Sequence, residues 1–369
     1  MQTLTLPTPD DLHIHLRDGA ALARTVPDAA AQCARALVMP NLTPAVDTID
    51  AVTAYRERIL AHIPADKTFT PLMSLYLSDS LTPETVLAAK AAGVVAIKWY
   101  PKGATTNSAQ GVADPQKLDP ILEAMQQAGL LLLIHGEVTT DGVDIFDREA
   151  TFIDSTLEPL RRRFPRLRIV LEHITTAHAV AYIQAQNDNL AATITAHHLL
   201  YNRNALLVGG LKPHFYCLPI LKTEADRRAL LAAIASGDSR YFMGTDSAPH
   251  PRHAKENACG CAGCYTGHAT LPFYAAAFEQ ANALDKLAAF AARHGADYYG
   301  LPYNTGEITL ERRQAQSRNR RPDYRRRQRT RPLPCGRNLA VAHRRITRSA
   351  HARHHPSHPH RPTHARLAA

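Results

Sequence analysis

The 369-residue chain lacks the long apolar runs of a membrane protein. No stretch reaches the roughly eighteen consecutive apolar residues that a membrane-spanning helix needs. The opening MQTLTLPTPDDLH has neither the basic start nor the apolar centre of a secretory signal peptide. Cysteine is also scarce, with six in the chain and three of them within CGCAGC (259–264). Cysteines so close together cannot cross-link distant segments, so we expect no disulfide scaffold and a cytoplasmic location.

Lysine is absent from the last 59 residues, and acidic residues are nearly so. Residues 311–369 hold 17 arginines against two acidic residues, a net charge of +15. The remaining 310 residues carry 26 basic and 31 acidic side chains, a net charge of −5. The chain's overall charge of +10 therefore comes from its C-terminal tail. We treat residues 1–310 as one domain and residues 311–369 as a separate tail.

The domain shows strand-like apolar runs that alternate with helix-like stretches. The predicted strands are 13–17, 34–41, 69–77, 94–100, 130–137, 168–175, 190–198 and 241–247. Strands alternating with helices favour a parallel sheet, and eight of them favour an α/β fold of the closed (β/α)₈, or TIM-type, barrel. An open, doubly wound sheet is the alternative, but no glycine-rich phosphate turn follows the first strand.

The stretch DDLHIHLRDG (10–19) alternates polar and apolar residues in the first predicted strand. Alternation predicts that His13, His15 and Arg17 share one face and that Leu12, Ile14 and Leu16 share the other. Neighbours on one face of a strand lie about 6.5–7 Å apart, so the two imidazoles can reach one metal ion. A half-buried strand with a polar face is the simpler interpretation of this stretch alone.

Other predicted strands also end in polar side chains. These are Asn41, Lys98, His135, His173 and Asp246, with His250 just beyond. In a barrel of this type the catalytic groups lie at the carboxyl ends of the strands. Together with the first strand, these ends supply four histidines and an aspartate, which are suitable ligands for a first-row divalent metal. They are His13, His15, His135, His173 and Asp246.

These residues and their surroundings resemble the amidohydrolase superfamily with a binuclear metal centre. The segments VMPNL, KWYPKGATTNS, IHGEVT, FDREA, EHITT, CLPILK and GTDSAPH, in this order, are similar to the shorter, stand-alone bacterial dihydroorotases. The resemblance runs from about residue 8 to residue 310. It implies zinc-dependent, reversible hydrolysis of (S)-dihydroorotate to N-carbamoyl-L-aspartate in pyrimidine biosynthesis.

The resemblance also implies a role for each polar strand end. The ligands of the more buried zinc ion would be His13, His15 and Asp246. Those of the second zinc ion would be His135 and His173. Lys98 would be N-carboxylated and would bridge the two metals, and Asp246 would also carry the proton to the leaving nitrogen.

The same resemblance implies substrate contacts. Arg17, Asn41 and His250 would bind the substrate carboxylate, for which an arginine offers a bidentate pair of donors. Backbone groups at Leu218 and Ala262 would bind the ureide edge of the ring.

Further polar segments allow more than one interpretation. In the family, Thr105 and Thr106 lie on a mobile loop that closes over the substrate, whereas a simple polar surface loop is the alternative. CGCAGC, with His250 and His253 nearby, has the spacing of a structural zinc site, but the resemblance favours a loop beside the substrate. His197 and His198 match no ligand of the family, and we interpret them as ordinary polar residues near the barrel rim.

The tail does not continue the family pattern. It is rich in arginine, proline, histidine and alanine, and Trp99 is the only tryptophan of the chain. Such a segment cannot bury enough apolar surface to offset its ordering entropy, so we expect disorder. Its composition favours a shifted reading frame over a nucleic-acid-binding tail, which is the competing hypothesis from another class. We expect a small-molecule substrate, a homodimer, and no membrane or nucleic-acid partner. A hydantoinase or allantoinase activity is the nearest enzymatic alternative.

Overall fold

The computed structural model describes residues 2–112, 114–186, 189–258 and 260–312. The predicted disorder of the tail therefore concerns residues that lie almost wholly outside the described part. The strands are β1 (Gln2–Pro7), β2 (Asp10–Ile14), β3 (Arg35–Val38), β4 (Thr70–Tyr76), β5 (Ala96–Trp99), β6 (Leu131–His135), β7 (Ile169–Glu172), β8 (Leu190–Ile194), β9 (Tyr241–Met243) and β10 (Glu307–Arg312).

Helices occupy most connections between the strands. The α-helices are α1 (Leu22–Gln32), α2 (Ile49–Leu60), α3 (Pro83–Ala91), α4 (Asp119–Ala128), α5 (Arg148–Phe152), α6 (Glu158–Arg163), α7 (Ala177–Gln184), α8 (Ala196–Leu200), α9 (Asn204–Leu207), α10 (Glu224–Ser236), α11 (Arg252–Lys255), α12 (Thr270–Gln280), α13 (Leu287–Ala292) and α14 (His294–Tyr299). The short 3₁₀ or π turns are η1 (Gly19–Ala21), η2 (Pro115–Leu118), η3 (Ile153–Leu157), η4 (Pro213–Phe215), η5 (Gly267–Ala269) and η6 (Leu284–Lys286).

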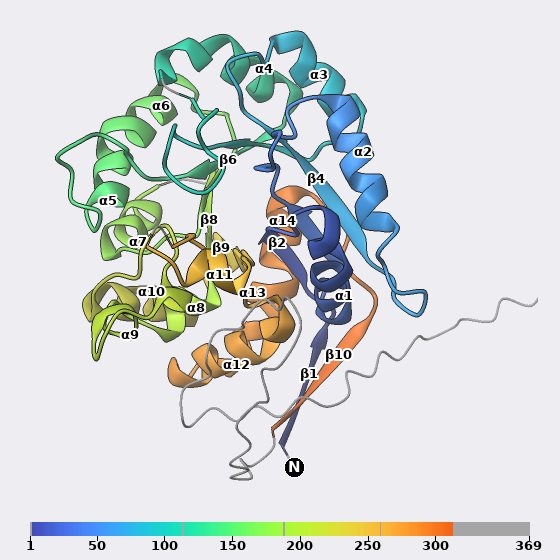
Figure 1. The fold of residues 1–369 in the computed structure, drawn as a ribbon, viewed down its shortest axis with the longest axis vertical. Helices are drawn as coiled ribbons and strands as arrows, with labels where there is room; N and C mark the ends of the chain where they lie inside the picture. The colour runs from blue at the N-terminus through green and yellow to red at the C-terminus, as the bar shows by residue number, and fades with distance from the viewer. Residues whose placement is uncertain (1, 113, 187–188, 259, 313–369) are drawn as a thin grey trace, which may run out of the picture.

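The eight strands β2 to β9 form one parallel sheet in sequence order. An isolated parallel bridge between Ile14 and Ser247 joins the first strand to the segment after the last one. The strands therefore nearly close into a barrel, and the helices surround them (Figure 1). This confirms the predicted (β/α)₈ architecture, because an open doubly wound sheet would have strands out of sequence order.

Local signals place the helices as the sequence indicated. Thr223 caps α10 in a reciprocal capping box with Asp226, and Gly237 ends it with a φ of 74°. Gly129 ends α4 in the same left-handed conformation, with a φ of 67°. Glycine is favoured there because this conformation crowds a Cβ atom.

The first barrel strand differs from its prediction. It spans Asp10–Ile14 rather than 13–17, and its register shifts between Asp11 and Ile14. As a result, Leu12 packs inside the barrel, while Ile14 and Leu16 pack in the cluster outside it. The simple alternation was wrong here because such a shift re-aims the side chains that follow it.

An additional antiparallel sheet joins the two ends of the described chain. β1 pairs with β10 over six residues on each strand, from Gln2 opposite Arg312 to Pro7 opposite Glu307. The two strands lie side by side at one end of the molecule (Figure 1). The division at residue 310 thus falls inside β10, and the domain division itself stays a prediction.

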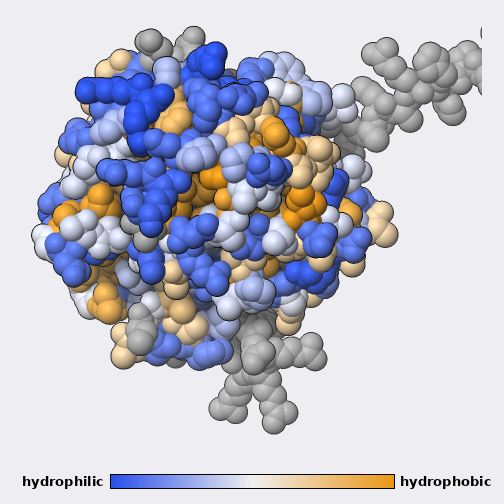
Figure 2. Space-filling view, turned by 90° about the horizontal axis from the view of Figure 1, so that it is seen from above, coloured by the Kyte–Doolittle hydropathy of each residue, from blue (hydrophilic) through white to orange (hydrophobic). Residues whose placement is uncertain are grey.

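Hydrophilic residues cover most of the face seen from above, with apolar residues in smaller patches among them (Figure 2). Within the described residues, no helix combines the length and apolarity needed to cross a bilayer. The largest apolar cluster lies between the barrel strands and the helices around them.

Candidate active site

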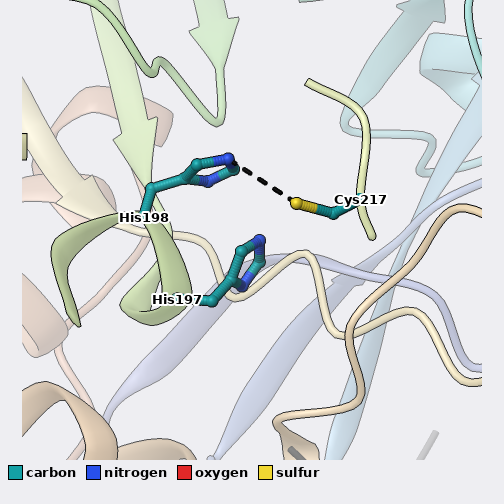
Figure 3. A group of neighbouring side chains, drawn as sticks. All are labelled: His197, His198 and Cys217. Atoms are coloured by element: carbon teal, nitrogen blue, oxygen red, sulfur yellow. Dashed lines mark hydrogen bonds between the residues drawn. The ribbon is translucent and has the colours of Figure 1, made fainter. Parts of the chain in front are cut away.

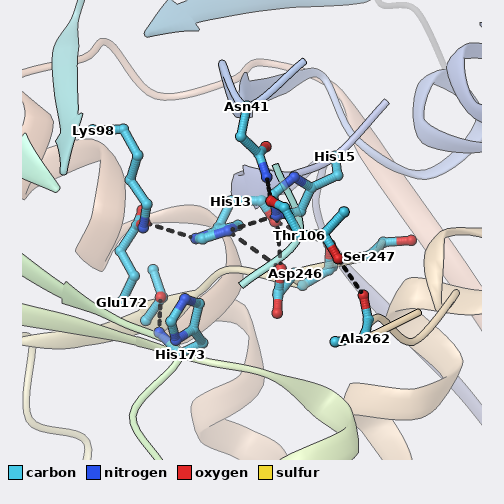
Figure 4. A network of polar contacts seen from close by, with 12 residues as sticks. His13, His15, Asn41, Lys98, Thr106, Glu172, His173, Asp246, Ser247 and Ala262 are labelled. Atoms are coloured by element: carbon cyan, nitrogen blue, oxygen red, sulfur yellow. Dashed lines mark hydrogen bonds and ion pairs between the residues drawn. The ribbon is translucent and has the colours of Figure 1, made fainter. Parts of the chain in front are cut away.

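The carboxyl ends of the barrel strands bring the predicted ligands together. His13 lies on β2, Lys98 on β5 and His135 on β6, whereas His15, His173 and Asp246 lie just after β2, β7 and β9. Side chains from these distant parts of the sequence meet at one end of the barrel (Figure 4). All six are buried.

His13, His15 and Asp246 form the first close group. One carboxylate oxygen of Asp246 lies 3.3 Å from Nε2 of His13 and 3.0 Å from Nε2 of His15. The two Nε2 atoms are 3.3 Å apart. Burial alone would raise the pKa of Asp246, but its contacts with the two imidazoles hold that pKa well below its usual range. Burial lowers the pKa of His15 to about 4, so this imidazole is neutral near pH 7 and has a lone pair to offer.

His173 lies between the first group and His135. Its ring centroid is 5.1 Å from that of His13 and 4.8 Å from that of His135. Nε2 of His135 in turn contacts Glu137 at 2.7 Å. The histidines expected for two metals thus form one continuous set.

Lys98 is fully buried on the other side of His13. Its amine contacts Glu172, whose same oxygen lies 2.9 Å from Nδ1 of His13. Burial lowers the pKa of Lys98 well below its usual value, an effect partly opposed by the Asp246 carboxylate. Burial therefore favours the neutral form of this amine, which is the form that can add carbon dioxide.

The donor set fits a divalent metal centre. At this end of the barrel, the described residues include two groups of mutually close ligand atoms. One is His13, His15 and Asp246, and the other is His13, Glu172 and His173. The Nδ1 atoms of His15 and His173 are buried without a hydrogen-bonding partner among the described residues. Neutral imidazoles and a carboxylate are typical ligands of zinc and its neighbours. The predicted site residues therefore suit the metal that the resemblance implies.

Three site residues adopt left-handed backbone conformations that side chains other than glycine rarely take. The φ angles are 61° at Arg17, 45° at His173 and 45° at Asp246. Each residue follows the end of a barrel strand. Such conformations cost free energy and occur frequently at functional sites, where the surrounding structure holds them in place.

The residues predicted to bind the substrate carboxylate lie next to the predicted metal ligands. Nη2 of Arg17 lies 2.9 Å from Nε2 of His250, and Nε of Arg17 donates to the Pro249 carbonyl at 3.1 Å. Burial and the nearby guanidinium lower the pKa of His250 to about 3, so its imidazole is neutral, and the same Nε2 lies 2.9 Å from the Ala262 carbonyl oxygen. Asn41 donates to the Thr106 carbonyl at 2.9 Å. Arg17, Asn41 and Thr106 line a single cavity together with His15, His135, His173 and Asp246.

The loop carrying Thr105 and Thr106 lies against this cavity. Thr106 donates its hydroxyl to the Ala262 carbonyl at 3.3 Å. Asn107, with a φ of 57°, donates to the Asn41 carbonyl at 3.0 Å. The loop therefore contacts two predicted substrate-binding residues rather than standing away as a surface loop, and its mobility stays a prediction.

Lys255 joins the two backbone segments predicted to bind the substrate ring. Its buried ammonium donates to the carbonyls of Tyr216, Cys261 and Gly263 at 2.8, 2.6 and 2.8 Å. These segments contain Leu218 and Ala262, which both line the cavity. Charge-assisted hydrogen bonds are stronger than neutral ones, so Lys255 fixes the spacing between the segments.

Sequence reasoning missed the acidic residues that support the site. Asp11 accepts from the backbone and hydroxyl of Thr245 at 2.9 and 2.6 Å, which fixes the segment before Asp246. Glu137 and Glu172 each contact a predicted ligand. The signal was present in the printed sequence, because each of these acids stands one or two residues from a ligand histidine.

Tyr100, Ala248 and Gly263 also line the cavity and were not predicted. Gly263 has a φ of 148°, and a Cβ atom there would lie 2.5 Å from the Ala248 carbonyl oxygen. A glycine is therefore required for this close approach beside the site.

The expectation that His197 and His198 lie near the barrel rim stays a prediction, but the two side chains are buried. They lie on α8, after β8, and are only 1% and 3% exposed. In CGCAGC, Cys264 is buried and Cys261 partly exposed, whereas Cys259 lies outside the described residues.

Glu149, within the FDREA segment, organises the chain after His173. It is buried on α5 and accepts from the backbone N–H groups and both hydroxyls of Thr175 and Thr176, at 2.6–3.0 Å.

Replacing Glu149 with alanine is expected to lower the free energy of unfolding by about 3 kcal/mol or more, because several buried donors lose their acceptor. The midpoint of urea unfolding measures this change. Glu158→Ala, at a half-exposed ion pair with Arg162, should cost less than about 1 kcal/mol, and equal losses in both variants would contradict the assignment.

Comparison with known proteins agrees with the geometry. A family model described as the amidohydrolase family matches residues 5–312. A dihydroorotase of Ralstonia nicotianae is 60% identical over 317 residues, covering 86% of this chain and 92% of the relative. The chain belongs to the amidohydrolase family, among the dihydroorotases.

Solved structures of dihydroorotases show the same fold. The Campylobacter jejuni structure superimposes with a TM-score of 0.80 and 35% identity, covering 90% of this chain and 94% of that one. The dihydroorotase of Saccharomyces cerevisiae, solved in complex with 5-fluoroorotic acid, gives a TM-score of 0.75 and 34% identity, covering 84% and 90%. The barrel is thus that of a known enzyme fold.

Proposed function

We propose that this chain is a dihydroorotase that hydrolyses (S)-dihydroorotate reversibly to N-carbamoyl-L-aspartate in pyrimidine biosynthesis. The observation that carries the proposal is that His15, His173 and Asp246 line one cavity with Arg17, and that His13 lies in the same ligand groups. The first four offer metal ligands, and the arginine offers a partner for the carboxylate that distinguishes this substrate. The high identity to dihydroorotases supports the same reaction.

Two zinc ions would be held by the predicted ligands. His13, His15 and Asp246 would hold one ion, and His135 and His173 would hold the other. Lys98, N-carboxylated, would bridge them. When bound, zinc lowers the pKa of water and polarises a carbonyl oxygen.

The residues of the chain itself orient the substrate and move the proton. Arg17, with neutral His250 behind it, would pair with the substrate carboxylate. Backbone groups at Leu218 and Ala262, held by Lys255, would bind the ureide edge. During hydrolysis the ring C–N bond breaks, the oxygen of water joins the carbonyl carbon, and a proton must reach the leaving nitrogen. Asp246 would accept this proton from the attacking water and return it to that nitrogen.

The test is hydrolysis of dihydroorotate by the purified, zinc-loaded chain. A panel containing hydantoin and allantoin separates this activity from the related cyclic amidohydrolases. Preference for dihydroorotate supports the proposal, and preference for a ring without a carboxylate would reject it.

Replacing Arg17 with methionine is expected to raise the KM for dihydroorotate about 30-fold or more, with a smaller change in kcat. The reason is that loss of one partner from a buried charge pair costs about 2–5 kcal/mol. Steady-state kinetics measure this separation. Arg24→Met removes a guanidinium that is 61% exposed and pairs with Asp28, so its KM should stay that of the unmodified enzyme. An unchanged KM in Arg17→Met would remove Arg17 from the substrate site.

The proposal extends to assembly and location. As the family resemblance implies, the enzyme would act as a homodimer in the cytoplasm. Analytical ultracentrifugation tests the first point, and a monomer at micromolar concentration would reject it. Cell fractionation tests the second.

A further inference from the structure

A second set of metal-binding side chains lies beside the cavity but outside the ligand set described above. His197 and His198 on α8 approach Cys217, and the ligand atoms of the three residues lie within 4.8 Å of one another. The two imidazole centroids are 4.5 Å apart. The rings and the thiol point toward a common space (Figure 3). All three residues are at most 3% exposed.

Neither ring nitrogen of His197 has a hydrogen-bonding partner of normal geometry among the described residues, although the side chain is buried. His197 interacts electrostatically with the Cys217 thiol of the same group. A buried polar group without a partner is destabilising. Native proteins rarely leave such a group unpaired unless water or an ion satisfies it.

Cys264 belongs to the same small apolar cluster as Cys217, but its thiol donates to the His214 carbonyl at 3.5 Å. Two imidazoles and one thiolate leave the fourth position of a tetrahedral zinc ion for a water molecule.

His198 is already oriented for such a role. Its Nδ1 lies 2.7 Å from the hydroxyl of Thr195, and its Nε2 lies 2.9 Å from the Pro219 carbonyl and 3.8 Å from Sγ of Cys217. When the proton moves from Nε2 to Nδ1, Nδ1 donates to Thr195 and Nε2 is free to bind metal. A ligand histidine typically donates its second ring nitrogen in this way.

We propose that His197, His198 and Cys217 bind one zinc ion, distinct from the centre at Asp246. Binding converts the Cys217 thiol to a thiolate and releases its proton to solvent, while the His198 proton stays on that ring. Coordination replaces the hydrogen bonds that His198 and Cys217 make to the Pro219 carbonyl.

The position of this site connects it to the substrate cavity. Cys217 directly precedes Leu218, which lines the cavity. The ion would therefore hold the segment that carries Leu218 against α8.

The test counts zinc in the full, zinc-loaded chain after dialysis against a zinc buffer. The unmodified protein and Cys33→Ala, which alters a buried cysteine of a different cluster, should bind one zinc ion more per chain than Cys217→Ala. His197→Gln, the milder change, should lose the same ion if Cys217→Ala folds poorly. With cobalt as the probe, only the first two proteins should show a thiolate-to-metal charge-transfer band, which histidine and carboxylate ligands cannot produce.

Two results would overturn the proposal. One is an equal zinc content in all four proteins together with the absence of the thiolate band. The other is a band that disappears in Cys261→Ala but persists in Cys217→Ala, which would place the ion on the CGCAGC loop instead. Neither readout depends on the hydrolytic activity of the chain.

Discussion

Replacing Asp246 with asparagine is expected to lower kcat for dihydroorotate hydrolysis by roughly 10³-fold, the scale of a lost general acid–base. The amide keeps the shape of the carboxyl group, so the fold should persist. It does not keep the basicity, and the carboxylate of Asp246 is held in its charged form by His13 and His15. Initial rates, measured with the zinc content of the same samples, separate a lost proton carrier from a lost ligand.

The matched control is an aspartate that also pairs with a histidine but lies outside the candidate site. Asp154 pairs with His178 at the surface, where its side chain is 67% exposed. Asp154→Asn should keep the rate of the unmodified enzyme. A rate for Asp246→Asn within tenfold of that control would exclude a catalytic role for Asp246.

Replacing Lys98 with methionine is expected to abolish the activity, by about 10³-fold or more, and to lower the zinc content. The reason is that Lys98 is the fully buried amine beside Glu172 and His13, and the proposed metal centre needs its carboxylated form to join the two ions. Metal-assisted activation of water depends on correctly held ions. Metal analysis and initial rates give both readouts.

Carbon dioxide gives this prediction a second test. Metal-free protein reconstituted with zinc should regain activity faster in bicarbonate than in buffer depleted of carbon dioxide, and Lys98→Met should regain none in either. Lys90, in the last turn of α3, provides the control, since Lys90→Met should behave as the unmodified enzyme. Bicarbonate-independent recovery in the unmodified protein would reject the carboxylated lysine.

The barrel was predictable because each buried parallel strand is a short apolar run and each helix carries its own start and stop signals. The general location of the site was predictable, because a polar residue that ends a parallel barrel strand lies at the carboxyl end of the barrel. The orientation of individual side chains at the strand ends was not predictable. Glu172 and His173 are adjacent, so an extended strand would aim them to opposite faces. Both reach the site because His173 leaves the extended conformation, with a φ of 45°.

Burial of His197 and His198 was hidden for a similar reason. They were assigned to the end of a strand, whereas the chain turns into α8 after Thr195, which caps that helix. The partner that makes the pair notable, Cys217, comes from a loop about twenty residues later. Contacts between loops depend on tertiary packing, and a local pattern does not encode them.

The pairing of β1 with β10 also sets the order in which the molecule can be completed during synthesis. β1 leaves the ribosome before the other described strands, but its partner is the last segment of the matched family region. Leu6 and Ile308, one from each strand, are both buried in the main core. Until Glu307–Arg312 has emerged, β1 has an unpaired edge and Leu6 lacks this neighbour. The N-terminal strand must therefore wait for nearly the whole domain, so a nascent chain stalled before residue 307 should remain more sensitive to protease at its N-terminus than the released protein.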